Sequence, residues 1–235
     1  IRIDGYLEEF SLSRKEADSA FSLISCNTEM SSVSNADLVI EAVPEILALK
    51  QSIFSNLDKI CKKNTIFASN TSSISVDEIA NSTNRPDSVI GMHFMNPVPL
   101  MKLVELIKGE KTSDEVVSRT KEIAEGLGKT VGVAEDYAGF ISNRVLMPMI
   151  NEAAFTLYEG VATRDDIDTI MKLGMNHPMG PLALADFIGI DVCVNILDYM
   201  RDQFGDPKFR CAPNMRRMVE AGKLGRKSGE GFYTY

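Results

Sequence analysis

The chain has 235 residues, of which 44% are hydrophobic, and its formal net charge is −8. This length and hydrophobic content are enough for one large folded domain or two small ones. The acidic balance argues against a nucleic acid as the main ligand, because binding a phosphate backbone requires a positive field. No run of about 18 apolar residues is present and no secretion leader is visible, so we expect no membrane partner.

The four cysteines lie far apart in the sequence and form no Cys-x-x-Cys pair; they are Cys26, Cys61, Cys193 and Cys211. This spacing predicts buried thiols in a reducing intracellular compartment rather than disulfides or a zinc site. With only two histidines in the chain, we expect no metal. Cytoplasm, peroxisome and mitochondrial matrix are not distinguished by these features.

The first part of the chain alternates predicted helices with predicted strands. It opens with a helical stretch at 1–20, in which Ser13 and Glu16 have the spacing of a capping box. Predicted strands follow at 36–43, 65–69, 88–94, 102–107 and 130–134. Predicted helices lie between them at 47–61, around 76–80 and from 113 to the glycines at 126 and 128. This alternation predicts a mostly parallel, layered α/β sheet.

Two of these elements carry more specific predictions. The near-continuous apolar run at 36–43 predicts a strand that is covered on both faces. In the helix at 47–61, the helical spacing predicts a buried face that contains Leu49, Ile53 and Leu57, with Lys50 facing elsewhere.

The pattern changes around 135–139, and from Phe140 onward the sequence has helical periodicity, interrupted by glycine and proline, and no convincing strand. Predicted helical stretches lie at 140–157, 164–173, 181–204 and 213–221. We therefore expect two domains, an α/β domain at 1–135 and an all-helical domain at 136–235. Because small-ligand sites favour the cleft between such halves, we expect a site at their junction.

Polar side chains gather between Ser69 and Glu105, where hydrophobic runs end. His93 and Glu105 fall on two predicted strands that are joined by a proline-containing turn. Imidazole exchanges protons near neutral pH, and a carboxylate on its other nitrogen fixes its tautomer and raises its basicity. The pair would suit proton abstraction from an alcohol. Spacing alone leaves open a second interpretation, in which His93 caps a strand end and Glu105 is solvated.

Other polar residues in this region have equally open interpretations. Ser72 and Asn70 either hydrogen-bond a substrate oxygen or cap the following helix. Asn143, early in the first helix of the second half, either reaches across the cleft or has a structural role. A Ser-His-Glu hydrolase triad is disfavoured, because the sequence has no G-x-S-x-G elbow.

The sequence contains a series of distinctive strings. In the first half they are ADLVIEA at 36–42, SNTSS at 69–73, GMHFMNPVP at 91–99 and KLVE at 102–105. The second half adds GFISNR at 139–144, DID at 166–168, HPMGP at 177–181 and GRKSGEGFY at 225–233. These strings resemble the L-3-hydroxyacyl-CoA dehydrogenase family, which includes the 3-hydroxybutyryl-CoA dehydrogenases. The resemblance covers essentially the whole chain, in order.

This resemblance implies a Rossmann-like α/β domain followed by an all-α C-terminal domain through which the family forms homodimers. It also implies the reversible oxidation of a (3S)-3-hydroxyacyl-CoA to a 3-oxoacyl-CoA with NAD or NADP, in fatty-acid metabolism and β-oxidation. A dehydrogenase of a related small hydroxy acid is an alternative.

The family's site residues can be transferred by position. The catalytic positions are His93, Glu105, Ser72 and Asn143. By analogy, His93 takes the proton of the 3-hydroxyl group, Glu105 orients His93, and the other two hydrogen-bond the substrate oxygen and the surroundings of the histidine. The positions that match cofactor contacts are Glu45, Lys50, Ser72, Asn96 and Lys227.

One departure from the family concerns its glycine-rich loop. The family begins with a strand, a G-x-G-x-x-G loop and a helix, and none of the 16 glycines here completes that spacing. The stretch at 1–20 resembles a later helical segment, so we expect that the first βαβ unit is absent and that a sheet edge is open. Either the sequence is part of a longer active dehydrogenase, or the short chain acts as a non-catalytic binding or dimerisation module. We expect little activity from the 235 residues alone, because they lack the pyrophosphate cradle.

Overall fold

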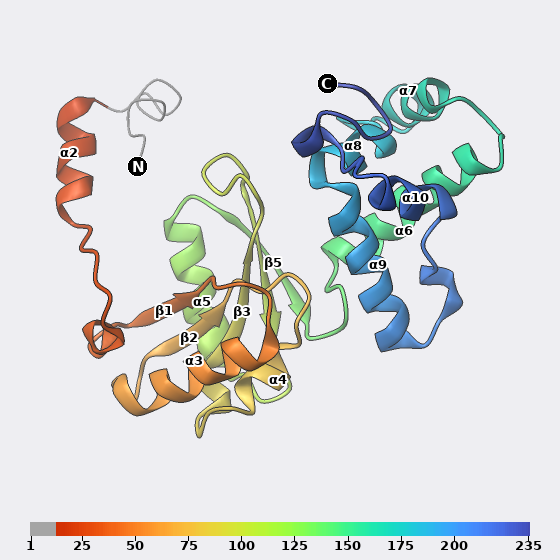
Figure 1. The fold of residues 1–235 in the computed structure, drawn as a ribbon. Coiled ribbons are helices and arrows are strands. Elements are labelled where there is room, and N and C mark those ends of the chain that lie inside the picture. Colours follow the sequence, from red (N-terminus) through yellow and green to blue (C-terminus); the bar gives the residue numbers. More distant parts are fainter. Residues whose placement is uncertain (1–12) are drawn as a thin grey trace.

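The computed structural model describes residues 13–235 (Figure 1). The start of the helical stretch predicted at 1–20 therefore lies outside the described residues. A sheet flanked by helices occupies one side of the molecule, and a cluster of helices that ends at the C-terminus occupies the other (Figure 1). The expectation of an α/β half followed by a helical half is confirmed.

The sheet has five strands in the order β1-β2-β3-β4-β5. They are β1 (Leu38–Glu41), β2 (Ile66–Ser69), β3 (Val89–Phe94), β4 (Leu103–Lys108) and β5 (Thr130–Glu135). All neighbouring pairs are parallel except β3 and β4, which are antiparallel. A helix separates the parallel neighbours in sequence, whereas β3 returns directly into β4 through a short turn and so must run antiparallel to it. The prediction of a mostly parallel sheet is confirmed.

Helices cover both faces of the sheet. They are α3 (Leu47–Ile60), α4 (Val76–Ala80) and α5 (Asp114–Gly126), with short 3-10 turns η1 (Met30–Val33) and η2 (Pro86–Ser88). On one face, Phe67 and Val89 of the sheet pack with Phe54 of α3. On the other face, Ile66, Ile90 and Leu106 pack with Val116 and Ala124 of α5. Successive strand residues thus enter opposite cores, as strand geometry requires.

The remaining helix of this half is α2 (Arg14–Ser22), which stands away from the sheet in Figure 1. Its N-terminus has the predicted capping box, in which the Ser13 side chain accepts from the Glu16 amide and the Glu16 carboxylate accepts from the Ser13 amide.

The buried face of α3 differs from the prediction. Lys50, Phe54 and Leu57 are buried, whereas Leu49 is 38% exposed. The Lys50 ammonium lies 2.8 Å from a carboxylate oxygen of the buried Glu41. A buried ion pair therefore occupies a position that hydrophobic spacing assigns to the surface.

Strand β1 also differs from the prediction of cover on both faces. Ile40 is 42% exposed. Within residues 13–235, β1 pairs only with β2, so its other edge meets no strand.

The helical half contains α6 (Ser142–Tyr158), α7 (Arg164–Gly174), α8 (Pro181–Ile188), α9 (Ile190–Phe204) and α10 (Pro213–Glu220), with short turns η3 (Pro207–Phe209) and η4 (Arg226–Ser228). Its core packs Ile150, Leu182, Leu197 and Met215 together. The stretch predicted at 181–204 is two helices rather than one, because Gly189 has a φ of 107°. That left-handed conformation ends α8 and suits glycine alone among common residues.

The cysteines are all free thiols. Cys61, Cys193 and Cys211 are buried as predicted, but Cys26 is exposed. Within the described chain, no helix is both long enough and apolar enough to cross a membrane.

Candidate active site

The antiparallel register of β3 and β4 places His93 directly opposite Glu105. The His93 Nδ1 atom lies 3.2 Å from Glu105 Oε2. Both side chains are largely buried, with side-chain exposures of 12% and 4%. The structure thus brings together the two residues that the sequence paired.

Glu105 also receives donors from the start of α6 in the other half. Its Oε1 atom accepts from the backbone amides of Ile141 at 2.8 Å and Ser142 at 3.2 Å, and its Oε2 atom accepts from Ser142 Oγ at 2.8 Å. Burial opposes ionisation of this carboxyl group, but the hydrogen bonds from His93, Ser142 and Ile141 outweigh burial and lower its pKa. Glu105 is therefore an ionised carboxylate that joins β4 to α6.

The chain reaches Glu105 through an unusual turn between β5 and α6. Gly139 and Phe140 both have positive φ, at 78° and 49°. At Gly139 a side chain would meet the Met200 sulfur at 2.6 Å, so both space and conformation favour glycine. The turn buries Phe140 in the core of the first half and sets its ring centroid 6.1 Å from that of His93. It thereby aims the first amides of α6 at Glu105.

The ionised carboxylate determines the tautomer of His93. A carboxylate only accepts hydrogen bonds, so His93 Nδ1 carries a proton. In the neutral ring the lone pair is then on Nε2. His93 can therefore act as a proton acceptor at Nε2 while Glu105 stabilises the charge that the ring acquires.

Ser72 and Asn143 meet across the junction of the two halves. Asn143 is 8% exposed, and its Nδ2 atom donates to the Ser72 backbone carbonyl at 2.9 Å. Asn70, by contrast, accepts from the Phe94 amide at 2.9 Å and supports the end of β3. The cap of α4 is Ser75, whose side chain accepts from the Glu78 amide. Ser72 is thus not the helix cap, and its hydroxyl is not committed to that role.

The turn that carries Ser72 is held by Glu45. Glu45 Oε1 accepts from Thr71 Oγ1 at 2.6 Å and from the amides of Ser72 at 2.9 Å and Ser73 at 3.0 Å. Burial works against ionisation, but the Thr71 hydroxyl, the Lys50 charge and the Ser72 amide together lower the pKa of Glu45. A carboxylate at this point fixes the backbone around Ser72.

Lys50 is enclosed by protein acceptors. Its side chain is fully buried, and its ammonium lies 2.8 Å from Glu41 and 3.2 Å from Glu45. Ser69 Oγ also donates to Glu41 at 2.7 Å. In this arrangement Lys50 supports Glu45, and so the Ser72 turn. Its contact with a cofactor stays a prediction.

Asn96 and Lys227 lie in different parts of the molecule. Asn96 is exposed just beyond β3 and forms a cis peptide bond with Pro97. Lys227 Nζ donates to Asp191 at 2.7 Å, at the first turn of α9. The other end of α9 contributes Tyr199 and Gln203 to the junction, and this helix of 15 residues is about 22 Å long. The structure therefore does not bring Lys227 to the other predicted site residues of the same chain.

Sequence reasoning missed Ser142 and Glu41. Ser142 was part of a family string, but a serine at a helix start is ordinarily read as a cap. Glu41 is an acidic residue inside an apolar strand run, which was an available indication of a buried partner.

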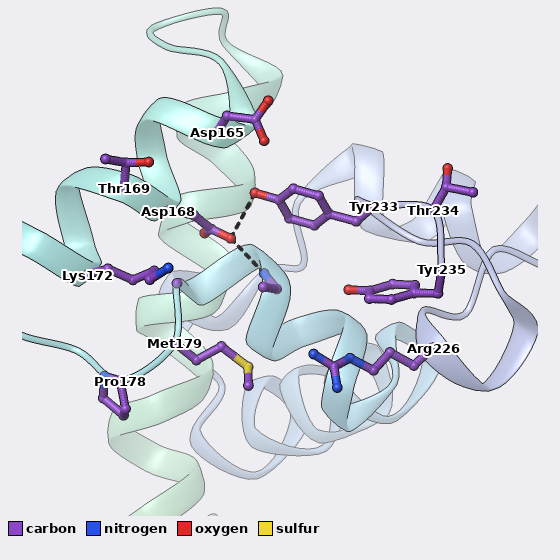
Figure 2. Close-up of a pocket in the computed structure, with 12 residues that line it drawn as sticks. Asp165, Asp168, Thr169, Lys172, Pro178, Met179, Arg226, Tyr233, Thr234 and Tyr235 are labelled. Atoms are coloured by element: carbon purple, nitrogen blue, oxygen red, sulfur yellow. Dashed lines mark hydrogen bonds between the residues drawn. The ribbon is translucent and has the colours of Figure 1, made fainter.

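Two cavities differ in their relation to this site. A cavity of about 540 Å³ lies in the helical half, where the Asp168 carboxylate accepts from the Ala183 amide and from the Tyr233 hydroxyl (Figure 2). The Leu182 amide also donates to Asp168. None of the predicted site residues lines it. A second cavity of about 300 Å³ lies at the junction between Ser73, next to Ser72, and Tyr199 of α9. Of these two cavities, the junction cavity is adjacent to the predicted site.

The described residues fit one end of the nicotinamide dinucleotide that the resemblance implies. Ser72 and Asn96 follow the carboxyl ends of β2 and β3, the edge of a parallel sheet where such cofactors bind. No G-x-G-x-x-G loop for the pyrophosphate occurs in the 235 residues. Ser72 and Asn96 could therefore hold the nicotinamide end. Within residues 13–235, no cluster of three or more His, Cys, Asp or Glu side chains could hold a metal ion.

Comparison with known proteins places both halves in one family. Residues 2–137 match a family model for the NAD binding domain of 3-hydroxyacyl-CoA dehydrogenase, and residues 139–235 match the model for its C-terminal domain. The chain is 54% identical over 220 residues to a probable 3-hydroxybutyryl-CoA dehydrogenase of Bacillus subtilis, covering 94% of this chain and 77% of that protein. It is 44% identical over 220 residues to the mitochondrial hydroxyacyl-coenzyme A dehydrogenase of Mus musculus, covering 93% of this chain and 70% of that protein.

A solved structure is similar throughout. The crystal structure of (S)-3-hydroxybutyryl-CoA dehydrogenase from Ralstonia eutropha matches with a TM-score of 0.95 at 46% identity, covering 99% of this chain and 82% of that one. The order of the strands, the helical second half and the residue strings at the site therefore have one explanation: the chain belongs to the 3-hydroxyacyl-CoA dehydrogenase family, and its first half is that family's NAD binding domain.

Proposed function

We propose that this protein catalyses the reversible oxidation of (3S)-3-hydroxybutyryl-CoA, or a closely related 3-hydroxyacyl-CoA, to the 3-oxoacyl-CoA in fatty-acid metabolism, including β-oxidation. The observation that carries the proposal is the buried pair of His93 and Glu105, with Nδ1 and Oε2 3.2 Å apart. The names of the similar bacterial proteins support a four-carbon substrate.

The chain's own residues supply the proton chemistry of this reaction. NAD or NADP, when bound, would supply the acceptor for the hydride that leaves carbon 3. His93 Nε2 takes the proton of the 3-hydroxyl group, and the ring becomes an imidazolium whose charge Glu105 offsets. Ser72 and Asn143 would hydrogen-bond the substrate oxygen. Their meeting at the junction and the absence of a capping role for the Ser72 hydroxyl support this assignment. Ser72 and Asn96 would contact the nicotinamide end of the cofactor. Glu45 and Lys50 would support that edge.

We also propose that the helical half, 136–235, forms a homodimer with a second copy. Three apolar side chains near the end of α7 are exposed: Ile170 at 60%, Leu173 at 81% and Met175 at 59%. Contiguous exposed apolar residues favour a protein partner. If a second copy covers them, the change Leu173→Asp lowers the mass measured by light scattering to that of a monomer. A dimer that survives the change would place the interface elsewhere.

The activity is tested in the native protein with (3S)-3-hydroxybutyryl-CoA and NAD or NADP, followed by the absorbance of the reduced cofactor. The variant His93→Gln removes the base, and we expect turnover to fall by about 10²- to 10⁴-fold. The control His177→Gln changes the other histidine, at 177 in the helical half, and should retain activity. Wild-type turnover by His93→Gln would refute the assignment. Preference for free 3-hydroxybutyrate over its CoA ester would instead support the alternative, a small hydroxy acid dehydrogenase.

A further inference from the structure

The two oxygens of Glu105 have different partners. Oε1 accepts two backbone amides, from Ile141 at 2.8 Å and Ser142 at 3.2 Å. Oε2 accepts two side-chain donors, Ser142 Oγ at 2.8 Å and His93 Nδ1 at 3.2 Å. One oxygen therefore anchors the carboxylate to α6, and the other is shared between a hydroxyl group and the predicted base.

Ser142 is not an ordinary helix cap. The N-cap position of α6 is Ile141, which makes no side-chain capping bond. The free amides at the start of the helix are instead bound by the Glu105 carboxylate from the other half, in the place where a helix N-terminus favours negative charge. The Ser142 hydroxyl thus donates to Glu105 and does not cap its own helix.

We infer that Ser142 is a positioning residue that tunes the basicity of His93 by competing for Oε2 of Glu105. A donor on that oxygen draws off part of its negative charge, so the carboxylate stabilises the imidazolium less than it would alone. The shorter of the two contacts belongs to the serine. The inference rests on the proposed function for its catalytic meaning, but the titration of His93 can be measured without it.

Two charged side chains of the neighbouring segments, Arg144 and Glu45, are engaged with other partners. On β4 the charged residue opposite His93 is Glu105 itself, and β5 places Gly132 opposite it. The first charged residue of α6 is Arg144, whose guanidinium lies over the Phe204 ring. Around the Ser72 turn, Glu45 is bound by Lys50 and by the turn itself.

The first test is an NMR titration of the two histidines in the native protein, assigned with His177→Asn. In Ser142→Ala the backbone amides still hold Oε1, and Oε2 is left to His93 alone. We expect the midpoint of the His93 titration to rise by about half a pH unit. A shift of this size corresponds to part of the free energy of one charge-assisted hydrogen bond. Ser142→Thr keeps the hydroxyl and should restore the wild-type midpoint. Ser142→Cys, a weaker donor, should lie between them and serves if the alanine variant does not fold.

The control is Ser75→Ala. It removes another hydroxyl-to-carboxylate bond near the same junction, from Ser75 Oγ to Asp136 at 2.7 Å, and should leave the His93 midpoint unchanged. In the activity assay, the acidic limb of kcat/KM for oxidation should move to higher pH with Ser142→Ala by the same amount. An unchanged or lowered His93 midpoint in Ser142→Ala would overturn the inference. If the wild-type protein shows no turnover, only the proposed function is refuted, because the titration of His93 can be measured without catalysis.

Discussion

Replacing Glu105 by glutamine tests how the site controls its base. Oε1 accepts two backbone amides, so the amide oxygen of the new side chain takes that position. The NH₂ group then occupies the position of Oε2, facing Ser142 Oγ and His93 Nδ1. Because an amide NH₂ only donates, Nδ1 must accept and the ring proton must move to Nε2. The lone pair that would take the substrate proton is lost.

The expected cost follows from that change of tautomer. We expect kcat for the oxidation of 3-hydroxybutyryl-CoA by the native protein to fall by about 10²- to 10⁴-fold, or about 3 to 5 kcal/mol of transition-state stabilisation. KM should change much less, because Glu105 touches His93 rather than the substrate. The matched control is Glu135→Gln, an exposed glutamate at the end of β5. Activity of Glu105→Gln within tenfold of wild type would refute the tautomer argument.

Two further predictions concern stability. Lys50→Met leaves the buried Glu41 carboxylate without its cation, so we expect the unfolding free energy measured with urea to fall by about 3 to 5 kcal/mol. The double variant with Lys50→Met and Glu41→Gln should lose less. Equal losses in the two variants would show that the pair does not act as a unit. The pKa values of Glu105 and Glu45 are lowered in the folded state, so their ionisation stabilises the fold above the unfolded value of about 4.3, and this stability is lost as the pH falls through the folded pKa. The urea midpoint of unfolding should therefore fall on acidification, and it should fall less steeply in the double variant with Glu105→Gln and Glu45→Gln. An unchanged dependence on pH in the double variant would contradict the conclusion that these two carboxylates stabilise the fold by ionising.

Most secondary structure was predictable because its causes are local. Alternating hydrophobic runs predicted the five strands, and the capping residues Ser13, Ser75 and Ser113 lie where three helices begin. The site stretch was also recognisable, since polar residues at the ends of apolar runs rarely serve a core. Spacing could not choose between a catalytic pair and a solvated pair at His93 and Glu105.

Other features depended on contacts between distant residues. Lys50 is buried against Glu41 of β1, a contact that hydrophobic spacing within α3 does not reveal. The break at Gly189 depends on a left-handed backbone that helical periodicity does not reveal. Ser142 acquires its partner only when α6 is aimed at β4 by the turn at Gly139 and Phe140.

The sequence by itself determined the alternation of elements, the family and the identity of the groups that can exchange protons. Tertiary structure alone decided which nitrogen of His93 is free and which donors share Glu105. The physical reason is the distance along the sequence between the residues that interact. Hydrophobic periodicity and capping act between residues a few positions apart, whereas the ionisation and tautomer of a buried pair depend on burial and on hydrogen bonds from strands and helices more than 30 residues away, as from Ser142 to Glu105.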